Sequence, residues 1–168
     1  MTRPMPSPTP SPDSTPGKRV PTCPEWAVRN LVAHVGLIHR RATLIVQTGE
    51  AVPFSNEGDV PADWGTWLRE GAEGLARAVA QAGDKEVWSF LGGTQPASFW
   101  LRRMLHDTTI HAVDAALTAE TSYDIPAGLA ADGIDEVLSL LELMEGINPR
   151  VRGASRRRRD AAIVLDAG

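Results

Sequence analysis

An aspartate and a histidine four residues apart are the first residues in this sequence that suggest chemistry. Asp107 and His111 lie in the segment HDTTIH, at residues 106 to 111. Residues four apart on an α-helix share a face, so both side chains would point the same way. Carboxylate and imidazole groups bind zinc and similar divalent ions, and a catalytic site of this kind uses three protein ligands. The pair therefore predicts two of the three ligands, or else a simple polar pair on a helix.

A histidine in an earlier segment supplies the candidate third ligand. His34 falls within an apolar stripe at helical spacing. The stripe consists of Leu31, Val35, Ile38, Ala42 and Ile45. His39 competes for the same role, and His106 competes as a ligand on the later helix. Periodicity does not choose between these sets, and a single inward histidine is also explained as a hydrogen-bonded core residue.

Four helices are predicted to position these side chains. The first begins at TCPEW, where Thr22 and Glu25 have the spacing of a capping box with Pro24 in the first turn. The other three are predicted over about 62–82, 96–117 and 127–144.

A Gly-Gly turn joins the second predicted helix to the third, and no strand is indicated before AAIVLDAG at residues 161 to 168. On the fourth helix, one stripe is predicted to face inward: Ile134, Val137, Leu138 and Leu141. The predicted fold class is therefore all-α, a four-helix bundle.

The composition divides the chain into a main domain over 21–149 and two tails. Residues 1–20 are rich in Pro and Ser and are predicted to be a disordered tail. Residues 150–168 hold six arginines and are predicted to be an irregular solvated tail, or the remnant of a truncated second domain. With two aspartates, this tail carries +4 of the net charge of −4, so residues 1–149 carry −8. An acidic main domain argues against a nucleic-acid surface there.

The sequence also favours a cytoplasmic protein. No apolar run approaches the roughly 20 residues that span a bilayer, and the N-terminus has no apolar region of a secretory signal. The single cysteine, Cys23, excludes an internal disulfide and is typical of a reducing compartment. We therefore expect no membrane partner, and the sequence leaves the oligomeric state open.

Two segments resemble the signature regions of the mycothiol-dependent maleylpyruvate isomerase family. They are VPTCPEWAVRNLVAHVGLIHRRA at 20–42 and PASFWLRRMLHDTTIHAVDA at 96–115, and ADGIDEVLSLL at 131–141 resembles the family's fourth helix. The resemblance implies a DinB/YfiT-like four-helix bundle with a divalent metal ion, zinc by default. By position it implies that His34, Asp107 and His111 are the metal ligands and that His39 and His106 are not.

The same resemblance implies the chemistry. In the family, the metal activates mycothiol, whose sulfur adds to a substrate double bond, allows rotation from cis to trans, and leaves. The implied partners are thus a small-molecule thiol and a small substrate, and the implied activity is thiol-assisted isomerisation or thiol transfer. The alternative is a non-catalytic four-helix module that binds a metal or a partner.

The chain departs from the family pattern at one ligand. The family's carboxylate is usually a glutamate, and this sequence has Asp107. One methylene less shortens the reach of the carboxylate by about 1.5 Å. The backbone would therefore have to shift, a water would have to bridge, or the site would be weakened.

Overall fold

The computed structural model describes residues 15–54 and 60–147, and these residues are mainly helical. The described helices of four residues or more are α1 (Val28–Thr48), α2 (Trp64–Ala82), α3 (Ser98–Thr118) and α4 (Ala127–Ile147). A 3-10 turn, η1 (Thr15–Gly17), precedes them. Two antiparallel hairpins complete the described part: β1 (Arg19–Val20) with β2 (Cys23–Ala27), and β3 (Glu86–Ser89) with β4 (Gly93–Pro96). The predicted helical class is confirmed. The prediction that no strand precedes residue 161 is wrong.

The start of the first helix differs from the prediction. Residues 23–27 form β2, and α1 begins at Val28, so Thr22 and Glu25 do not form a capping box. The cap comes instead from Asn30, whose side-chain oxygen accepts a hydrogen bond from the backbone N–H of Ala27 at 3.0 Å. Residues 23–27 pair with β1 as an antiparallel strand instead of extending the helix.

Part of the predicted N-terminal tail is ordered. Residues 15–20 form η1 and β1, and the Val20 side chain is fully buried. Burial of a valine side chain contributes about 1.5–3 kcal/mol, which offsets part of the cost of ordering this segment. The rest of that tail, residues 1–14, and the predicted Arg-rich tail at 150–168 lie outside the described residues.

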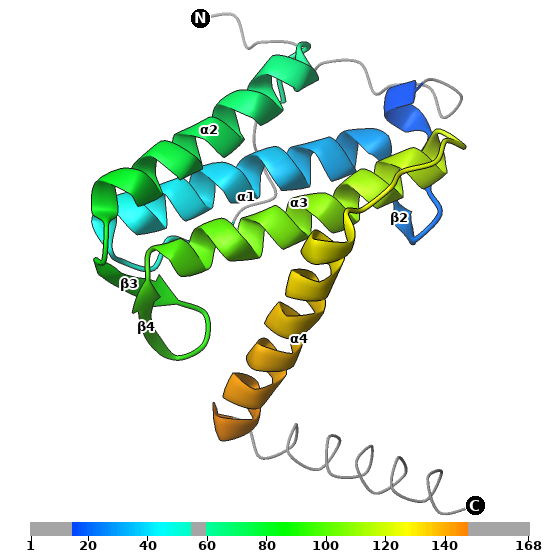
Figure 1. Cartoon of the computed structure of the whole chain (residues 1–168). Helices are drawn as coiled ribbons and strands as arrows, with labels where there is room; N and C mark the ends of the chain where they lie inside the picture. The colour runs from blue at the N-terminus through cyan, green and yellow to red at the C-terminus, as the bar shows by residue number, and fades with distance from the viewer. Residues whose placement is uncertain (1–14, 55–59, 148–168) are drawn as a thin grey trace, which may run out of the picture.

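Helices α1, α2 and α3 pack side by side around the core (Figure 1). The stripe predicted on α1 is buried there, and Leu75, Val79, Trp100 and Met104 meet it from α2 and α3. The β3–β4 hairpin closes one end of this core, because Val87 is fully buried and the Trp88 carbonyl accepts a hydrogen bond from Trp100 Nε1 at 2.8 Å. The three helices thus form a scaffold in which α1 and α3 face each other.

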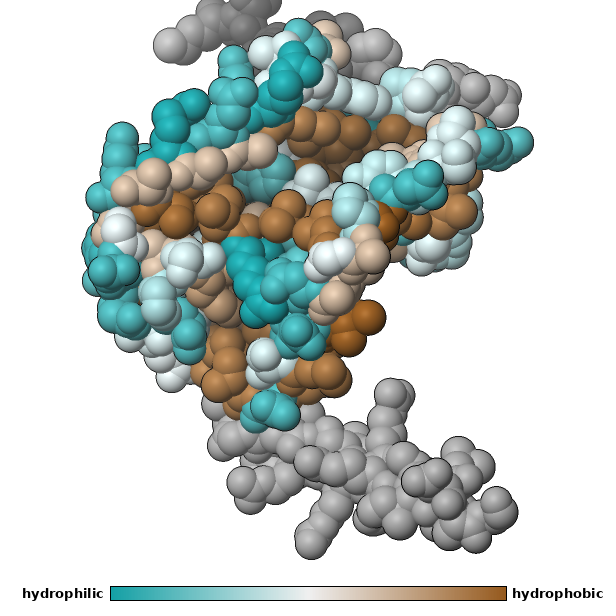
Figure 2. Space-filling model, in the orientation of Figure 1, coloured by the Kyte–Doolittle hydropathy of each residue, from teal (hydrophilic) through white to brown (hydrophobic). Residues whose placement is uncertain are grey.

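After the end of α3 the chain folds back along this helix, and α4 then runs at an angle to the other three helices (Figure 1). The residues predicted to face inward on α4 are instead 42–63% exposed: Ile134, Val137, Leu138 and Leu141. Figure 2 shows hydrophobic residues at the surface along α4. The periodicity identified the apolar stripe correctly, but within the described residues no element covers it.

A cavity of about 400 Å³ lies between α3 and α4 and has a mainly apolar lining. Two ion pairs with arginine join these helices. Asp132 of α4 binds Arg102 of α3, and Glu136 of α4 binds Arg103 of α3. None of the described helices is long and apolar enough to cross a membrane.

The contact between α1 and α2 depends on a glycine. A Cβ atom added at Gly36 would lie 2.0 Å from the ring of Trp67, and that ring is held under the guanidinium of Arg40 at 4.4 Å. We expect Gly36→Ala to lower the free energy of unfolding by about 1–3 kcal/mol through overpacking, despite the higher helix propensity of alanine. Urea unfolding measures the loss.

Gly74 on α2 is the matched control. No atom lies within 4 Å of a Cβ added there, so Gly74→Ala should raise the free energy of unfolding by about 0.5–1 kcal/mol. If the two variants were equally stable, the close contact at Gly36 would not limit side-chain size.

Candidate metal centre

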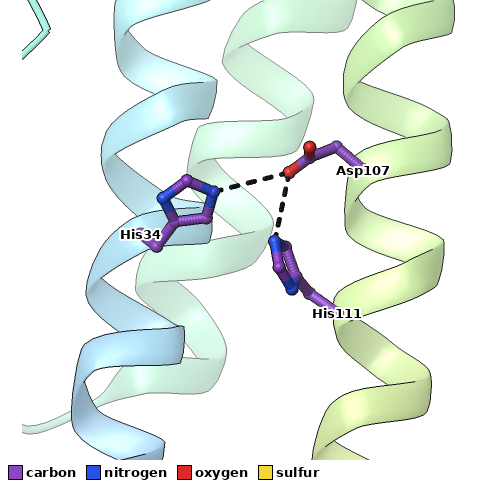
Figure 3. A group of neighbouring side chains, drawn as sticks. All are labelled: His34, Asp107 and His111. Carbon is purple, nitrogen blue, oxygen red and sulfur yellow. Dashed lines mark ion pairs between the residues drawn. The ribbon is translucent and has the colours of Figure 1, made fainter. Parts of the chain in front are cut away.

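The three residues implied as ligands meet between α1 and α3. His34 lies in the second turn of α1, and Asp107 and His111 lie one turn apart on α3, pointing toward it (Figure 3). One atom from each residue can be chosen so that all three lie within 4.8 Å of one another. Their side chains are 15–23% exposed, so the cluster is largely shielded from solvent. Their role as ligands stays a prediction.

The two oxygens of Asp107 have different partners. Oδ1 accepts a hydrogen bond from Arg103, one turn earlier on α3, at 3.2 Å. Oδ2 is buried without a hydrogen-bond partner. It faces Nε2 of His34 at 3.7 Å and Nε2 of His111 at 3.6 Å, which are too long for hydrogen bonds. A buried carboxylate oxygen without a donor is costly, and a bound cation would satisfy it.

Two of the three separations in the cluster are close to those of a metal site. Two ligand atoms held about 2.0–2.1 Å from a tetrahedral zinc ion lie about 3.4 Å apart. The distances of 3.6 and 3.7 Å from Asp107 Oδ2 to the two imidazoles exceed this by only a few tenths of an ångström. The shorter aspartate side chain therefore still brings its carboxylate between the two histidines.

The local charges favour the ionised form of Asp107. Burial alone would raise the pKa of this carboxyl group. The neighbouring imidazoles of His34 and His111 and the Arg103 guanidinium outweigh that effect and hold the pKa below its ordinary value. At neutral pH the cluster therefore offers an anionic oxygen between two imidazoles, which is a suitable donor set for a divalent cation.

The competing histidines point elsewhere. His39 is 3% exposed, and its Nε2 lies 2.7 Å from the hydroxyl of Thr108. That hydroxyl donates its hydrogen to the Met104 carbonyl, so His39 Nε2 must be the donor in the first bond. Burial is the main cause that lowers the pKa of His39, opposed by the charge of Asp107, so the ring is a neutral core residue. His106 faces α4, where its Nε2 lies 2.6 Å from Asp132.

Aromatic residues form the wall of the cluster. The ring centroid of Trp26 in β2 lies 5.0 Å from that of His34 and 6.0 Å from that of His111. Phe54 approaches His34 edge-on at 6.1 Å. A small pocket of about 100 Å³ next to His34 is lined by Trp26, Asn30 and Ala33. These rings line the two imidazoles, and the small pocket reaches His34.

The sequence alone did not identify three neighbours of the cluster. Arg103 binds Asp107, Asp114 binds His111, and Thr22 binds Asp114. The spacing of three between His111 and Asp114 on one helix could have indicated their contact. The contact between Thr22 and Asp114 joins residues 92 positions apart and has no local signal.

The fold and the cluster define a helical domain with a His-Asp-His group between two helices. A comparison with protein families shows which family this domain resembles. The model of the mycothiol maleylpyruvate isomerase N-terminal domain matches residues 10–116. The chain belongs to this family, as its signature segments suggested. The matched region includes His34, Asp107 and His111 and ends before α4. No match was found among curated proteins or among solved structures.

Proposed function

We propose that this domain binds a divalent metal ion, zinc by preference, through His34, Asp107 and His111. The observation that supports this most directly is the unpaired, buried oxygen of Asp107 facing two imidazole nitrogens at 3.6 and 3.7 Å. Nitrogen and oxygen donors in this number suit zinc at a site with one position left open. Membership of the family supports the same ligand set.

We further propose that the bound ion serves a thiol, mycothiol in keeping with the family, in cis–trans isomerisation or thiol transfer on a small substrate. A divalent ion lowers the pKa of a coordinated thiol and holds it as the reactive thiolate. The chain's own contribution would be to hold the ion, to exclude water with the rings of Trp26 and Phe54, and to keep Asp107 ionised through Arg103. The DinB/YfiT-like four-helix arrangement also stays a proposal.

Cobalt substitution tests thiol binding separately from catalysis. The cobalt-loaded protein should develop a sulfur-to-cobalt charge-transfer band when mycothiol is added, and the zinc-loaded protein should then convert maleylpyruvate only in the presence of mycothiol. The His111→Ala variant, prepared in parallel, should show neither response. Cobalt binding without a charge-transfer band would refute the thiol role and favour the alternative, a non-catalytic metal-binding module.

A further inference from the structure

We infer that Asp114 and Thr22 are positioning residues that fix the imidazole of His111 in the orientation and tautomer needed for metal binding. The inference rests on the proposed metal site and concerns how the site is built. The three residues form one hydrogen-bonded chain: Thr22 at the turn of the β1–β2 hairpin, Asp114 on α3, and His111 one turn earlier on α3.

The two hydrogen bonds among these residues are short, and each involves a different oxygen of Asp114. His111 Nδ1 lies 2.8 Å from Asp114 Oδ2, and the Thr22 hydroxyl donates to Asp114 Oδ1 at 2.6 Å. Each carboxylate oxygen therefore has one of the two partners. Asp114 is 5% exposed, so water competes little for these bonds. The carboxylate is held in place from both sides.

The bond to Asp114 determines which nitrogen of His111 carries hydrogen. A carboxylate only accepts hydrogen bonds, so Nδ1 of His111 must carry the hydrogen. The free electron pair is then on Nε2, the nitrogen that faces Asp107 Oδ2 at 3.6 Å. A carboxylate behind a metal-binding histidine fixes the ring and makes its other nitrogen more basic, and loss of such a partner typically costs about 10- to 100-fold in metal affinity.

Asp114→Asn tests this dependence with a single change of oxygen to NH₂. The Thr22 hydroxyl can donate to the amide oxygen or accept from the amide NH₂, so the amide can face His111 in either direction. The amide oxygen is a weaker acceptor for the Nδ1–H group than a carboxylate, and the amide NH₂ pairs only with an Nδ1 that carries no hydrogen. Both orientations lower the preference for the Nδ1–H form, and the Nε2–H form cannot bind a cation through Nε2.

The first readout is the tautomer of His111 in metal-free protein, from the ¹⁵N chemical shifts of the ring nitrogens. The native protein should show the Nδ1–H form, and Asp114→Asn should show a clearly larger share of the Nε2–H form. The second readout is zinc affinity by competition with a chromophoric chelator, which should fall about 10- to 100-fold in Asp114→Asn. A purely structural role, tying the hairpin to α3, would move neither readout in a variant that remains folded.

Asp132→Asn is the matched control. Asp132 accepts a bond from His106 at 2.6 Å, so the same chemical change is made at a histidine–aspartate pair outside the cluster. It should leave the His111 tautomer and the zinc affinity unchanged. Thr22→Val and Thr22→Ser form a second pair that spares the carboxylate: valine should weaken zinc binding, and serine should restore it.

The outcomes separate this inference from the proposed function. Zinc binding that is equal in the native protein, Asp114→Asn and Thr22→Val, with an unchanged tautomer, would overturn the positioning role while the metal site stands. Failure of the native protein to bind zinc would overturn the metal site. The tautomer measurement on metal-free protein would still decide whether Asp114 sets the state of His111.

Discussion

Replacing both His34 and His111 with alanine should abolish zinc binding. Four-ligand zinc sites are worth about 10–16 kcal/mol, or about 3 kcal/mol per ligand, so the loss of two ligands corresponds to about 10⁴-fold in affinity. Asp107 alone would remain, and a single carboxylate between two cavities does not hold zinc against water. Elemental analysis of protein purified without a His-tag should give about one equivalent in the native chain and none in the variant.

Stability gives an independent measure of the same binding. Free zinc at about 1,000 times its dissociation constant should raise the free energy of unfolding of the native protein by about 4 kcal/mol, and it should leave the double variant unchanged. His106→Gln is the control, because His106 binds Asp132 of α4 and lies outside the cluster. Equal metal content in the native protein and the double variant would contradict the site, provided that circular dichroism shows both to be helical.

The second large effect is expected at Arg103, which joins α4 to the cluster. Its guanidinium binds Glu136 of α4 and Asp107 of α3. The Glu136 side chain is only 4% exposed, so Arg103→Leu would leave a buried carboxylate without its cation. Breaking a buried pair in this way costs about 3–5 kcal/mol. We expect a loss of that size in urea unfolding, together with faster hydrogen exchange in α4, because its displacement would expose Glu136 to water.

The neighbouring arginine is a matched control. Arg102 binds Asp132, but these side chains are 39% and 48% exposed. An exposed pair contributes about 0–1 kcal/mol, so Arg102→Leu should cost much less than Arg103→Leu. Replacing Arg103 and Glu136 together by leucine should recover part of the stability, because Glu136 no longer leaves a buried charge, although Asp107 has still lost the guanidinium of Arg103. Equal, small effects of the two arginine variants would show that Glu136 is not buried in solution.

Local sequence signals determined most of the helices. Asp63 caps α2 by accepting the Thr66 N–H at 3.0 Å, and α1 ends where Gly49 adopts a φ of 87°. Both signals act within one helical turn, so the sequence contains all the information they need. The same holds for the shared face of Asp107 and His111. Strand β2 is the exception, because its pairing with β1 overrides the capping signal of Thr22 and Glu25.

The apolar stripes show where local information ends. Periodicity indicates which residues share a face of a helix, but it does not indicate what that face meets. On α1 the stripe meets α2 and α3 and is buried. On α4 the predicted stripe, which includes Ile134 and Leu141, is exposed in the described structure. The difference depends on the angle between α4 and the other three helices (Figure 1), and that angle is a tertiary property.

The candidate site divides in the same way. The sequence by itself determined the residue types, the pairing of Asp107 with His111, and the resemblance that selected His34. Only the tertiary structure decided that His34 faces the pair while His39 binds Thr108, and that Asp114 and Thr22 stand behind His111. Spacing along one helix is set by the covalent chain, whereas the rotation of one helix against another is set by the packing of all their side chains together.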